Sequence, residues 1–290
     1  MTYQTLINGV ADKTLPITDR GLAYGDGIFE TFRVIDGEVL LFERHWNRLA
    51  ESLHRLNISL PLSEEELRIG LKTVVSDRHG VAKLIVTRGS GGRGYRAPDK
   101  TYSQWILQGF PLPETDPEDY LNGVAVRSCR LKLSEQPLLA GMKHLNRLEQ
   151  VMARNEWQDD YFEGLMFSQS GALIEATMAN LFIIQGNRLL TPMLNLCGVK
   201  GVMRDEVLST DDRYLSGITE LKETSLDADA LLNSDAAFIC NSVRGIVPIA
   251  SWNASDGTLI RKWGSSDHPA LMALMKHYHQ KLALPFPGEI

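Results

Sequence analysis

Lys143 is the residue of this sequence whose type and surroundings suit covalent chemistry. It stands in the segment 139–147, LAGMKHLNR, where apolar residues surround it and the pattern predicts a loop that leads into a helix. Burial lowers the pKa of a lysine, and an uncharged lysine can form a Schiff base with a carbonyl group. Most lysines are exposed and protonated, however, so without further information an unreactive surface position is the favoured interpretation of Lys143.

A glycine-rich string, TRGSGGRGY at residues 87–95, is the second feature that could bind a ligand. Its glycines match the G-x-G-x-x-G pattern of dinucleotide sites, but residues 95–98 include a proline and cannot begin a long helix in that register. Arg88 and Arg93 could instead bind a carboxylate, whose two oxygens match a planar guanidinium group. A solvated hairpin loop with two surface arginines fits the string equally well.

Other reactive side chains occur without the spacing that their chemistry needs. His277 and His279 are two residues apart on an expected helix, so they point to different faces, and we expect both at the surface. The motifs H-E-x-x-H and G-x-S-x-G are absent. The cysteines Cys129, Cys197 and Cys240 are far apart and form no C-x-x-C pair. Metal binding, acyl hydrolysis and a disulfide framework have little support, and a reducing cytoplasm fits best.

The elements that position these residues begin with an α+β pattern. Strands are expected at 27–35, 39–42, 82–87 and 104–110, and helices at 43–57 and from Ser63 onward. Ser63 and Glu66 form a capping box at the start of the second helix. The acidic, proline-rich stretch 111–123 has the composition of an exposed linker. We therefore expect a small N-terminal α+β domain over 1–113, a linker over 114–122 and a larger domain over 123–290.

The larger domain is expected to be a mixed, mainly β structure with helices. Strands are predicted at 124–131, 164–167, 173–177, 181–184, 188–190 and 236–240, and helices at about 144–157, 202–208 and 269–284. The fold class is thus α/β (α+β) with two domains.

Charge and hydropathy exclude several partners. The net charge of −6 and the pI near 5.7 give no excess of basic residues for nucleic acid or an anionic membrane. No apolar run reaches the roughly 18 to 20 residues of a membrane helix, and the first residues lack the pattern of a secretory signal. We expect a cytoplasmic protein that binds neither nucleic acid nor membrane.

Two motifs together carry a resemblance to a known family. The strings GMKHLNRLEQ at 141–150 and RGSGGRGY at 88–95 closely resemble the aminodeoxychorismate lyases, which are class IV, fold-type IV relatives of the branched-chain and D-amino acid aminotransferases. The resemblance extends from Leu6 to Ser242 and implies a larger domain that is β-barrel-like. It also implies a pyridoxal 5′-phosphate enzyme that cleaves 4-amino-4-deoxychorismate into 4-aminobenzoate and pyruvate, a step of folate synthesis.

The resemblance implies a set of cofactor residues. Lys143 matches the Schiff-base lysine, and Glu175 matches the glutamate that pairs with the pyridine nitrogen. Arg48 matches the phosphate-binding arginine. The remaining phosphate ligands are expected to be the amides of Val202 and Met203, at a helix start, and the hydroxyl of Ser242. Without the resemblance, Arg48 would be expected on a helix surface, Glu175 could face solvent from a strand, and Ser242 would be an ordinary residue at a strand end.

The substrate residues are also implied by the resemblance. Thr31 matches a threonine thought to transfer a proton to the departing enolpyruvyl group, although a β-branched strand residue explains it as well. Arg93, Tyr95 and, beside them, Arg88 are expected to bind a substrate carboxylate. Tyr24 matches an active-site aromatic, for which core packing is an equal explanation. No residue of the sequence is assigned to the second carboxylate.

Two alternatives remain open at this stage. A fold-type IV aminotransferase acting on D- or branched-chain amino acids would share the cofactor residues, and a non-catalytic binding protein could retain the fold. The resemblance further implies a homodimer. Because Arg48 and Arg93 precede the expected linker while Lys143, Glu175 and Ser242 follow it, we expect the site between the two domains.

Overall fold

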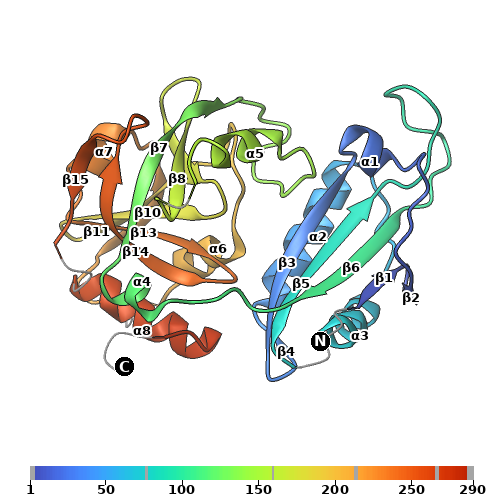
Figure 1. Ribbon diagram of the computed structural model, residues 1–290, viewed down its shortest axis with the longest axis horizontal. Coiled ribbons are helices and arrows are strands. Elements are labelled where there is room, and N and C mark those ends of the chain that lie inside the picture. Colours follow the sequence, from blue (N-terminus) through green and yellow to red (C-terminus); the bar gives the residue numbers. More distant parts are fainter. Residues whose placement is uncertain (1–3, 76–77, 159, 212–214, 265–267, 286–290) are drawn as a thin grey trace. The chain divides into compact units, whose positions relative to one another are not determined.

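A computed structural model of the chain describes residues 4–75, 78–158, 160–211, 215–264 and 268–285. The chain divides into two units, of which the first is drawn mainly in blue to cyan and the second mainly in green to red in Figure 1. The N-terminal unit comprises Met1–Pro113 together with Met142–Asn146, and the C-terminal unit comprises Glu114–Gly141 and Arg147–Ile290. The first boundary follows Pro113, and the short segment around Lys143, which the sequence assigned to the larger domain, lies with the N-terminal unit.

The N-terminal unit is an antiparallel sheet with helices on one face. Its elements are β1 (Thr5–Ile7), β2 (Val10–Ala11), α1 (Arg20–Tyr24), β3 (Gly27–Ile35), β4 (Glu38–Val39), α2 (Phe42–Arg55), α3 (Glu64–Val74), β5 (Gly80–Thr87) and β6 (Gln104–Phe110). The six strands follow the order β2-β1-β6-β5-β3-β4. The predicted strand over 27–35 is confirmed, as is the capping box of Ser63 and Glu66. The strand expected over 39–42 is shorter, because α2 begins at Phe42.

The core of this unit explains how β3 presents its two faces. Ile28, Phe32 and Val34 are buried in a cluster with Leu49 of α2 and Leu71 of α3. Successive side chains of a strand alternate between faces, so the intervening residues of β3 point to the face that the helices do not cover. Because α2 and α3 pack against one face of β3, only the residues on its other face remain available for further contacts.

The C-terminal unit is built on a curled mixed sheet of nine strands (Figure 1). Its elements are α4 (Pro117–Leu121), β7 (Val124–Leu133), α5 (Leu148–Arg154), β8 (Glu163–Ser168), β9 (Leu173–Ala176), β10 (Asn180–Gln185), β11 (Arg188–Pro192), α6 (Val202–Leu208), β12 (Glu220–Thr224), α7 (Ala228–Leu232), β13 (Ala236–Asn241), β14 (Gly245–Asn253), β15 (Leu259–Lys262) and α8 (Pro269–Leu282). The strand order is β12-β11-β10-β13-β14-β7-β8-β9, and β15 pairs with β14.

Two residues of this unit are buried where the sequence predicted exposure. Tyr120 of α4 lies in the stretch expected to be an exposed linker, and it is buried and donates a hydrogen bond to the Arg244 carbonyl. His279, expected at the surface, is also buried, and its Nε2 accepts the Ile246 amide at 3.0 Å. In both cases the partner lies on or beside β14, far away in the sequence, so local composition carried no sign of it.

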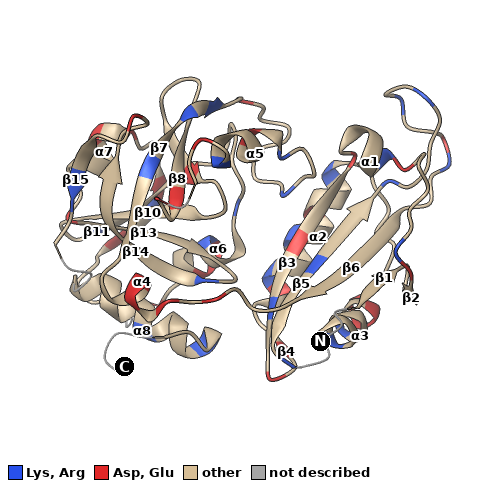
Figure 2. Ribbon diagram, viewed as in Figure 1, with Lys and Arg blue, Asp and Glu red and all other residues tan. Residues whose placement is uncertain are grey.

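Charged residues of both signs occur throughout each unit. Lys and Arg are interspersed with Asp and Glu along the elements (Figure 2). No helix among the described residues is both long enough and apolar enough to cross a membrane.

Candidate active site

Lys143 is held in an extended segment that pairs with the start of β3. The Phe29 amide donates to the Lys143 carbonyl at 2.9 Å, and the Leu145 amide donates to the Gly27 carbonyl at 3.0 Å. The helix expected from about residue 144 is therefore wrong in its start, since α5 begins at Leu148. Backbone groups that bond to a neighbouring strand cannot also bond within a helix, so the pairing of residues 143–145 with β3 keeps the helix from starting before Leu148.

The residues before Lys143 are fixed as well. Gly141 has a φ of 83°, in the left-handed region that suits glycine. Its amide donates to the Gly198 carbonyl at 2.9 Å, and its carbonyl accepts the Lys200 amide at 3.1 Å. The backbone is thus held by hydrogen bonds on both sides of Lys143, so only the side-chain torsion angles of this lysine determine where its amine lies.

The Lys143 side chain lies on the face of β3 that the helices do not cover. Its Nζ is 4.5 Å from the centre of the Phe29 ring. Thr31 follows two residues later on β3 and so shares the face of Phe29. The strand register sets Thr31 opposite Lys83 of β5, and the Lys83 Nζ lies 5.2 Å from the same ring. The structure therefore brings Lys143, Thr31 and a lysine that the sequence did not single out to one face of this sheet.

Arg48 belongs to a largely buried cluster around Glu30 of β3, and this cluster is near enough to Lys143 that the charges of Arg48 and Lys143 both act on His45. Its Nε and Nη2 donate to the two carboxylate oxygens of Glu30, at 2.8 and 2.5 Å, and Nδ1 of His45 lies 2.7 Å from the same carboxylate. Although burial alone would raise it, the Arg48 charge and the His45 hydrogen bond hold the pKa of Glu30 down at about 2. Burial lowers the pKa of His45, so its ring is neutral and donates to Glu30. The surface position that the sequence alone suggested for Arg48 is therefore excluded.

Glu175 is a buried carboxylate at the end of β9 in the C-terminal unit. It is 4% exposed, and its Oε2 accepts the Val199 amide at 2.8 Å. Burial lowers the pKa of Arg147, and the charge of Glu175 offsets only part of that lowering. Gly198, with a φ of 84°, passes so close that a Cβ there would lie 3.3 Å from Oε2 of Glu175. A solvent-facing strand carboxylate is ruled out by this burial.

Asn180 connects β10 to the start of α6. Its Oδ1 accepts the Gly201 amide at 3.0 Å, and its Nδ2 donates to the Val199 carbonyl at 2.9 Å. A Cβ on Gly201 would lie 2.0 Å from Oδ1 of Asn180, so this close approach requires glycine. Helix α6 then begins at Val202 with no side-chain cap, followed by Met203. Amides at such a helix start are suited to an anion.

Ser242 lies in the turn that joins β13 to β14. The side chain of Asn241 shapes this turn, because its Oδ1 accepts the amides of Val243 and Arg244 at 3.0 and 2.8 Å. The same Asn241 donates from Nδ2 to the Met178 carbonyl at 3.3 Å. The turn of Ser242 is therefore tied to the strand connection that follows Glu175.

The glycine-rich loop is held by α1. Arg20 donates from Nη1 and Nη2 to the carbonyls of Gly94 and Tyr95, at 3.0 and 2.9 Å, and the Tyr24 hydroxyl accepts the Gly94 amide at 3.0 Å. The rings of Tyr24 and Tyr95 meet edge to face at 5.6 Å between centroids. Arg93, in contrast, is exposed at the tip. The sequence did not single out Arg20, which orders this loop.

Arg88 serves the framework of the N-terminal unit. Its guanidinium group donates to both carboxylate oxygens of Asp26 and to the carbonyls of Leu56 and Asn57. These bonds direct the group toward α1 and the end of α2. We therefore separate Arg88 from Arg93, with which the sequence grouped it.

Some of these residues carried a signal that sequence reasoning overlooked. Glu30 lies between Ile28 and Phe32 on the same face of β3, so the pattern predicts a charged side chain that is buried in the core and needs a partner there. Asn180 carried no such signal, because its partners are backbone groups of the loop before α6. The bonds of Arg20 to the glycine-rich loop carried none either, since they go to the backbone carbonyls of Gly94 and Tyr95, far along the chain.

Comparison with known proteins agrees with this geometry. The sequence model of the amino-transferase class IV family matches residues 27–252. An aminodeoxychorismate lyase of Vibrio harveyi is 32% identical over 256 residues, which cover 87% of this chain and 93% of the relative. A crystal structure of 4-amino-4-deoxychorismate lyase from Pseudomonas aeruginosa is 38% identical and has a TM-score of 0.85, covering 95% of this chain and 98% of that one. A D-alanine aminotransferase of Bacillus licheniformis is 28% identical and covers 81% of this chain and 82% of the relative.

The chain belongs to the class IV aminotransferase family, and its fold is fold-type IV. Pyridoxal 5′-phosphate is the cofactor of this family and hence of this chain. The described residues fit that group. Glu175 offers a buried carboxylate to a pyridinium nitrogen, and α6 offers uncapped amides to a phosphate.

Proposed function

We propose that this chain is a lyase that converts 4-amino-4-deoxychorismate into 4-aminobenzoate and pyruvate. The observation that carries the proposal is the shared face of β3, where Lys143 lies over Phe29 and Thr31 follows two residues on. A lysine that can move a proton and a hydroxyl that can deliver one are the two groups that this elimination requires. The similarity to two lyases over most of the chain supports the same activity.

The cofactor residues divide into three tasks. Lys143 binds the cofactor covalently, Glu175 pairs with its ring nitrogen, and Arg48, the amides of Val202 and Met203 and the hydroxyl of Ser242 bind its phosphate. When bound, pyridoxal phosphate supplies an electron sink for the charge left when a bond to the amine-bearing carbon breaks. Glu30 keeps the Arg48 guanidinium in one orientation for this purpose.

Two residues carry out the proton transfers of the reaction. Lys143 removes the proton from the amine-bearing carbon of the substrate ring, and Thr31, or a water molecule that it orders, protonates the departing enolpyruvyl group to give pyruvate. Loss of that group makes the ring aromatic, which drives the reaction forward. No amino acceptor is consumed, in contrast to a transamination.

The two carboxylates of the substrate need cations. We assign one to Arg93, with Tyr95 and Tyr24 shaping the loop beside it. Lys83 is our candidate for the other, because the register places it opposite Thr31 on the same face. Arg88 contributes indirectly, by holding Asp26 and thereby Arg20 beneath the loop.

A product assay tests the proposal. Purified protein is given chorismate, glutamine and an aminodeoxychorismate synthase, and 4-aminobenzoate and pyruvate are measured. We expect both products in equal amounts, their loss in Lys143→Ala, and their retention in the control Lys72→Ala, which changes an exposed lysine of α3. A protein that forms neither product but moves nitrogen between a D- or branched-chain amino acid and a 2-oxo acid would be an aminotransferase.

We further propose that the protein acts as a homodimer in the cytoplasm. The family resemblance supports the dimer. The burial of Cys129, Cys197 and Cys240, which raises the pKa of each thiol to about 12, suits thiols that stay reduced. Sedimentation of the active protein tests the dimer, and a fully active monomer would contradict it.

A further inference from the structure

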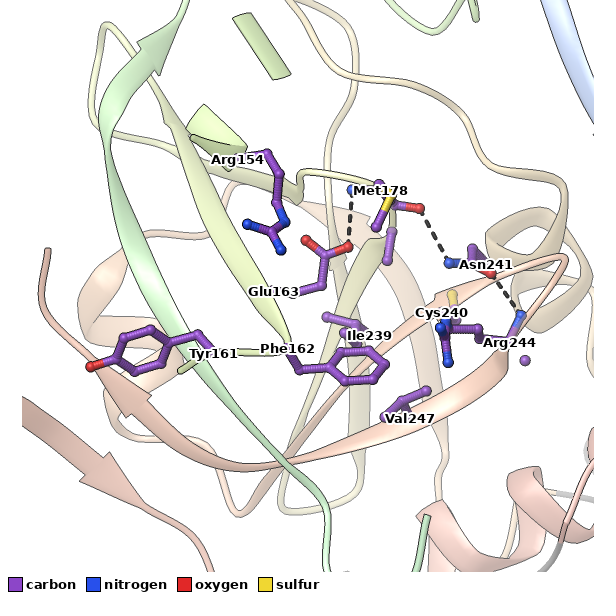
Figure 3. A pocket seen from close by; sticks show the side chains of 12 residues that line it. Arg154, Tyr161, Phe162, Glu163, Met178, Ile239, Cys240, Asn241, Arg244 and Val247 are labelled. Atoms are coloured by element: carbon purple, nitrogen blue, oxygen red, sulfur yellow. Dashed lines mark hydrogen bonds between the residues drawn. The ribbon is translucent and has the colours of Figure 1, made fainter. Parts of the chain in front are cut away.

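Glu163 is a buried carboxylate to which the proposed reaction gives no part. It is the first residue of β8 and is 2% exposed. Its oxygens accept hydrogen bonds from the amides of Gly164, Thr177 and Met178, at 3.2, 3.1 and 3.1 Å, and from the Thr177 hydroxyl at 2.5 Å. Figure 3 shows the carboxylate turned toward Met178 at the wall of a pocket of about 260 Å³.

Burying the Glu163 carboxylate is unfavourable in free energy. Burial raises the pKa of Glu163 to about 7, even though the Thr177 hydroxyl and three amides act in the opposite direction. Removing a charged group from water raises the free energy of the folded state, and a neutral or apolar residue at the same position would not have this effect. Groups of this kind cluster at functional sites, and Glu163 is bonded to a turn of the cofactor site.

The turn that Glu163 binds joins two residues of the cofactor site. Thr177 and Met178 form the connection between Glu175, near the end of β9, and Asn180, at the start of β10. The turn is closed by the Ala176 amide, which donates to the Ala179 carbonyl at 2.7 Å. A displacement of this turn would move both of its ends.

Both ends are in contact with the loop before α6. On one side Glu175 accepts the Val199 amide, and on the other Asn180 accepts the Gly201 amide. The Met178 carbonyl, in the middle, accepts from Asn241, the neighbour of Ser242. The turn is thus connected to the carboxylate for the ring nitrogen, to the helix start and to the serine turn.

We propose that Glu163 is a positioning residue, whose carboxylate fixes the turn at Thr177 and Met178 and thereby sets the spacing between Glu175 and Asn180 on which cofactor retention depends. This inference rests on the cofactor assignment above and not on the identity of the substrate. Both carboxylate oxygens of Glu163 accept hydrogen bonds. A glutamine at this position would have only one acceptor oxygen, and its NH2 group would face a donor in place of the other.

The test compares Glu163→Gln with Glu163→Asp and with the control Glu156→Gln. Glu156 is also a carboxylate that accepts two amides, those of Arg130 and Leu131, but it holds β7 rather than the turn. For each holoenzyme, the rate of cofactor release after dilution is followed by absorbance, together with thermal unfolding. We expect Glu163→Gln to release the cofactor about tenfold faster than Glu156→Gln, at a similar melting temperature, and to show a shifted cofactor absorption band.

Each remaining outcome decides the question. Partial recovery of retention in Glu163→Asp, which keeps the charge, supports the proposal. Equal release from Glu163→Gln and Glu156→Gln overturns it, as does faster release that only parallels a loss of thermal stability. A wild-type protein that retains its cofactor but makes no 4-aminobenzoate refutes the lyase function, while the comparison of release rates still decides the role of Glu163.

Discussion

Arg48 and Glu30 form a two-point ion pair in the core of the N-terminal unit, with donor to acceptor distances of 2.8 and 2.5 Å. The planar fork of an arginine matches a carboxylate in this way, so the pair fixes the plane of the guanidinium group as well as its position. Glu30 is 1% exposed, and a charge at such a depth is tolerated only with its partner. The pair is therefore both a stability element and the support of the proposed phosphate ligand.

Acid should weaken the fold through Glu30. Its pKa is about 2 in the folded chain against an ordinary value of 4.5, so the folded state favours the ionised form. The stabilisation is complete above pH 4.5 and is lost as the pH falls toward 2, by about 3 kcal/mol in total. Urea unfolding at a series of pH values should show this decline in the wild type and a flatter curve in Glu30→Gln.

Glu43→Gln serves as the control for that experiment. Glu43 pairs with Arg68 at 2.6 Å on the surface of the same unit, where such pairs contribute about 0–1 kcal/mol. Its pH profile should follow the wild type. A Glu30→Gln profile as steep as that of Glu43→Gln would show that Glu30 is not the group responsible.

Lys143→Arg should abolish activity without unfolding the protein. The backbone of residue 143 pairs with β3 whatever its side chain, so the extended segment is retained. Arginine cannot bind the cofactor covalently or act as a base, and the loss of a base costs on the order of 10² to 10⁴-fold in rate. Absorption spectra and thermal unfolding check the two halves of this prediction, and a variant with wild-type turnover would contradict the role of Lys143.

Thr31→Val should lower kcat by about 10²-fold or more while KM changes little, because a hydroxyl used only in proton delivery stabilises the transition state alone. Thr31→Ser keeps the hydroxyl and should retain most of the rate. Steady-state kinetics of 4-aminobenzoate formation distinguish the two variants. Equal losses in both would point to packing on β3 instead of proton transfer.

Arg93 and Arg88 should separate binding from stability. Arg93 is exposed, so Arg93→Ala should raise KM by about tenfold and leave the melting temperature unchanged. Arg88 makes its bonds within the N-terminal unit, so Arg88→Ala leaves Asp26 without one of its partners and should destabilise the fold by about 3 kcal/mol. The reverse assignment, with KM raised chiefly by Arg88→Ala, would return Arg88 to the substrate site.

The sequence predicted the elements whose information is local. Alternation gave β3 its correct limits at 27 and 35, the capping box placed the start of α3, and the limits of α6 at 202 and 208 were also correct. The family membership that two short motifs indicated is confirmed. Patterns of this kind depend on neighbours within a few residues, which a single sequence contains.

Long-range partners account for what the sequence missed. The helix expected before Leu148 starts late because Lys143 and Leu145 bond to β3, more than a hundred residues earlier in the chain. The roles of Glu163 and Arg20 likewise depend on backbone groups of remote turns. No periodicity or composition signals a hydrogen bond to a distant carbonyl or amide, so these contacts needed the structure.

The segment 142–146 also governs the order in which the molecule can be completed. Residues 27–29 of β3 bond to it along one edge, and the chain reaches these partners only after the whole of β7 has been made. A nascent or truncated chain ending at residue 113 therefore carries an unpaired strand end, the kind of edge at which chains aggregate. The segment 142–146, which carries the reactive lysine, also pairs with that edge of β3. Lys143 can therefore take its place only in a chain whose β3 edge is already paired.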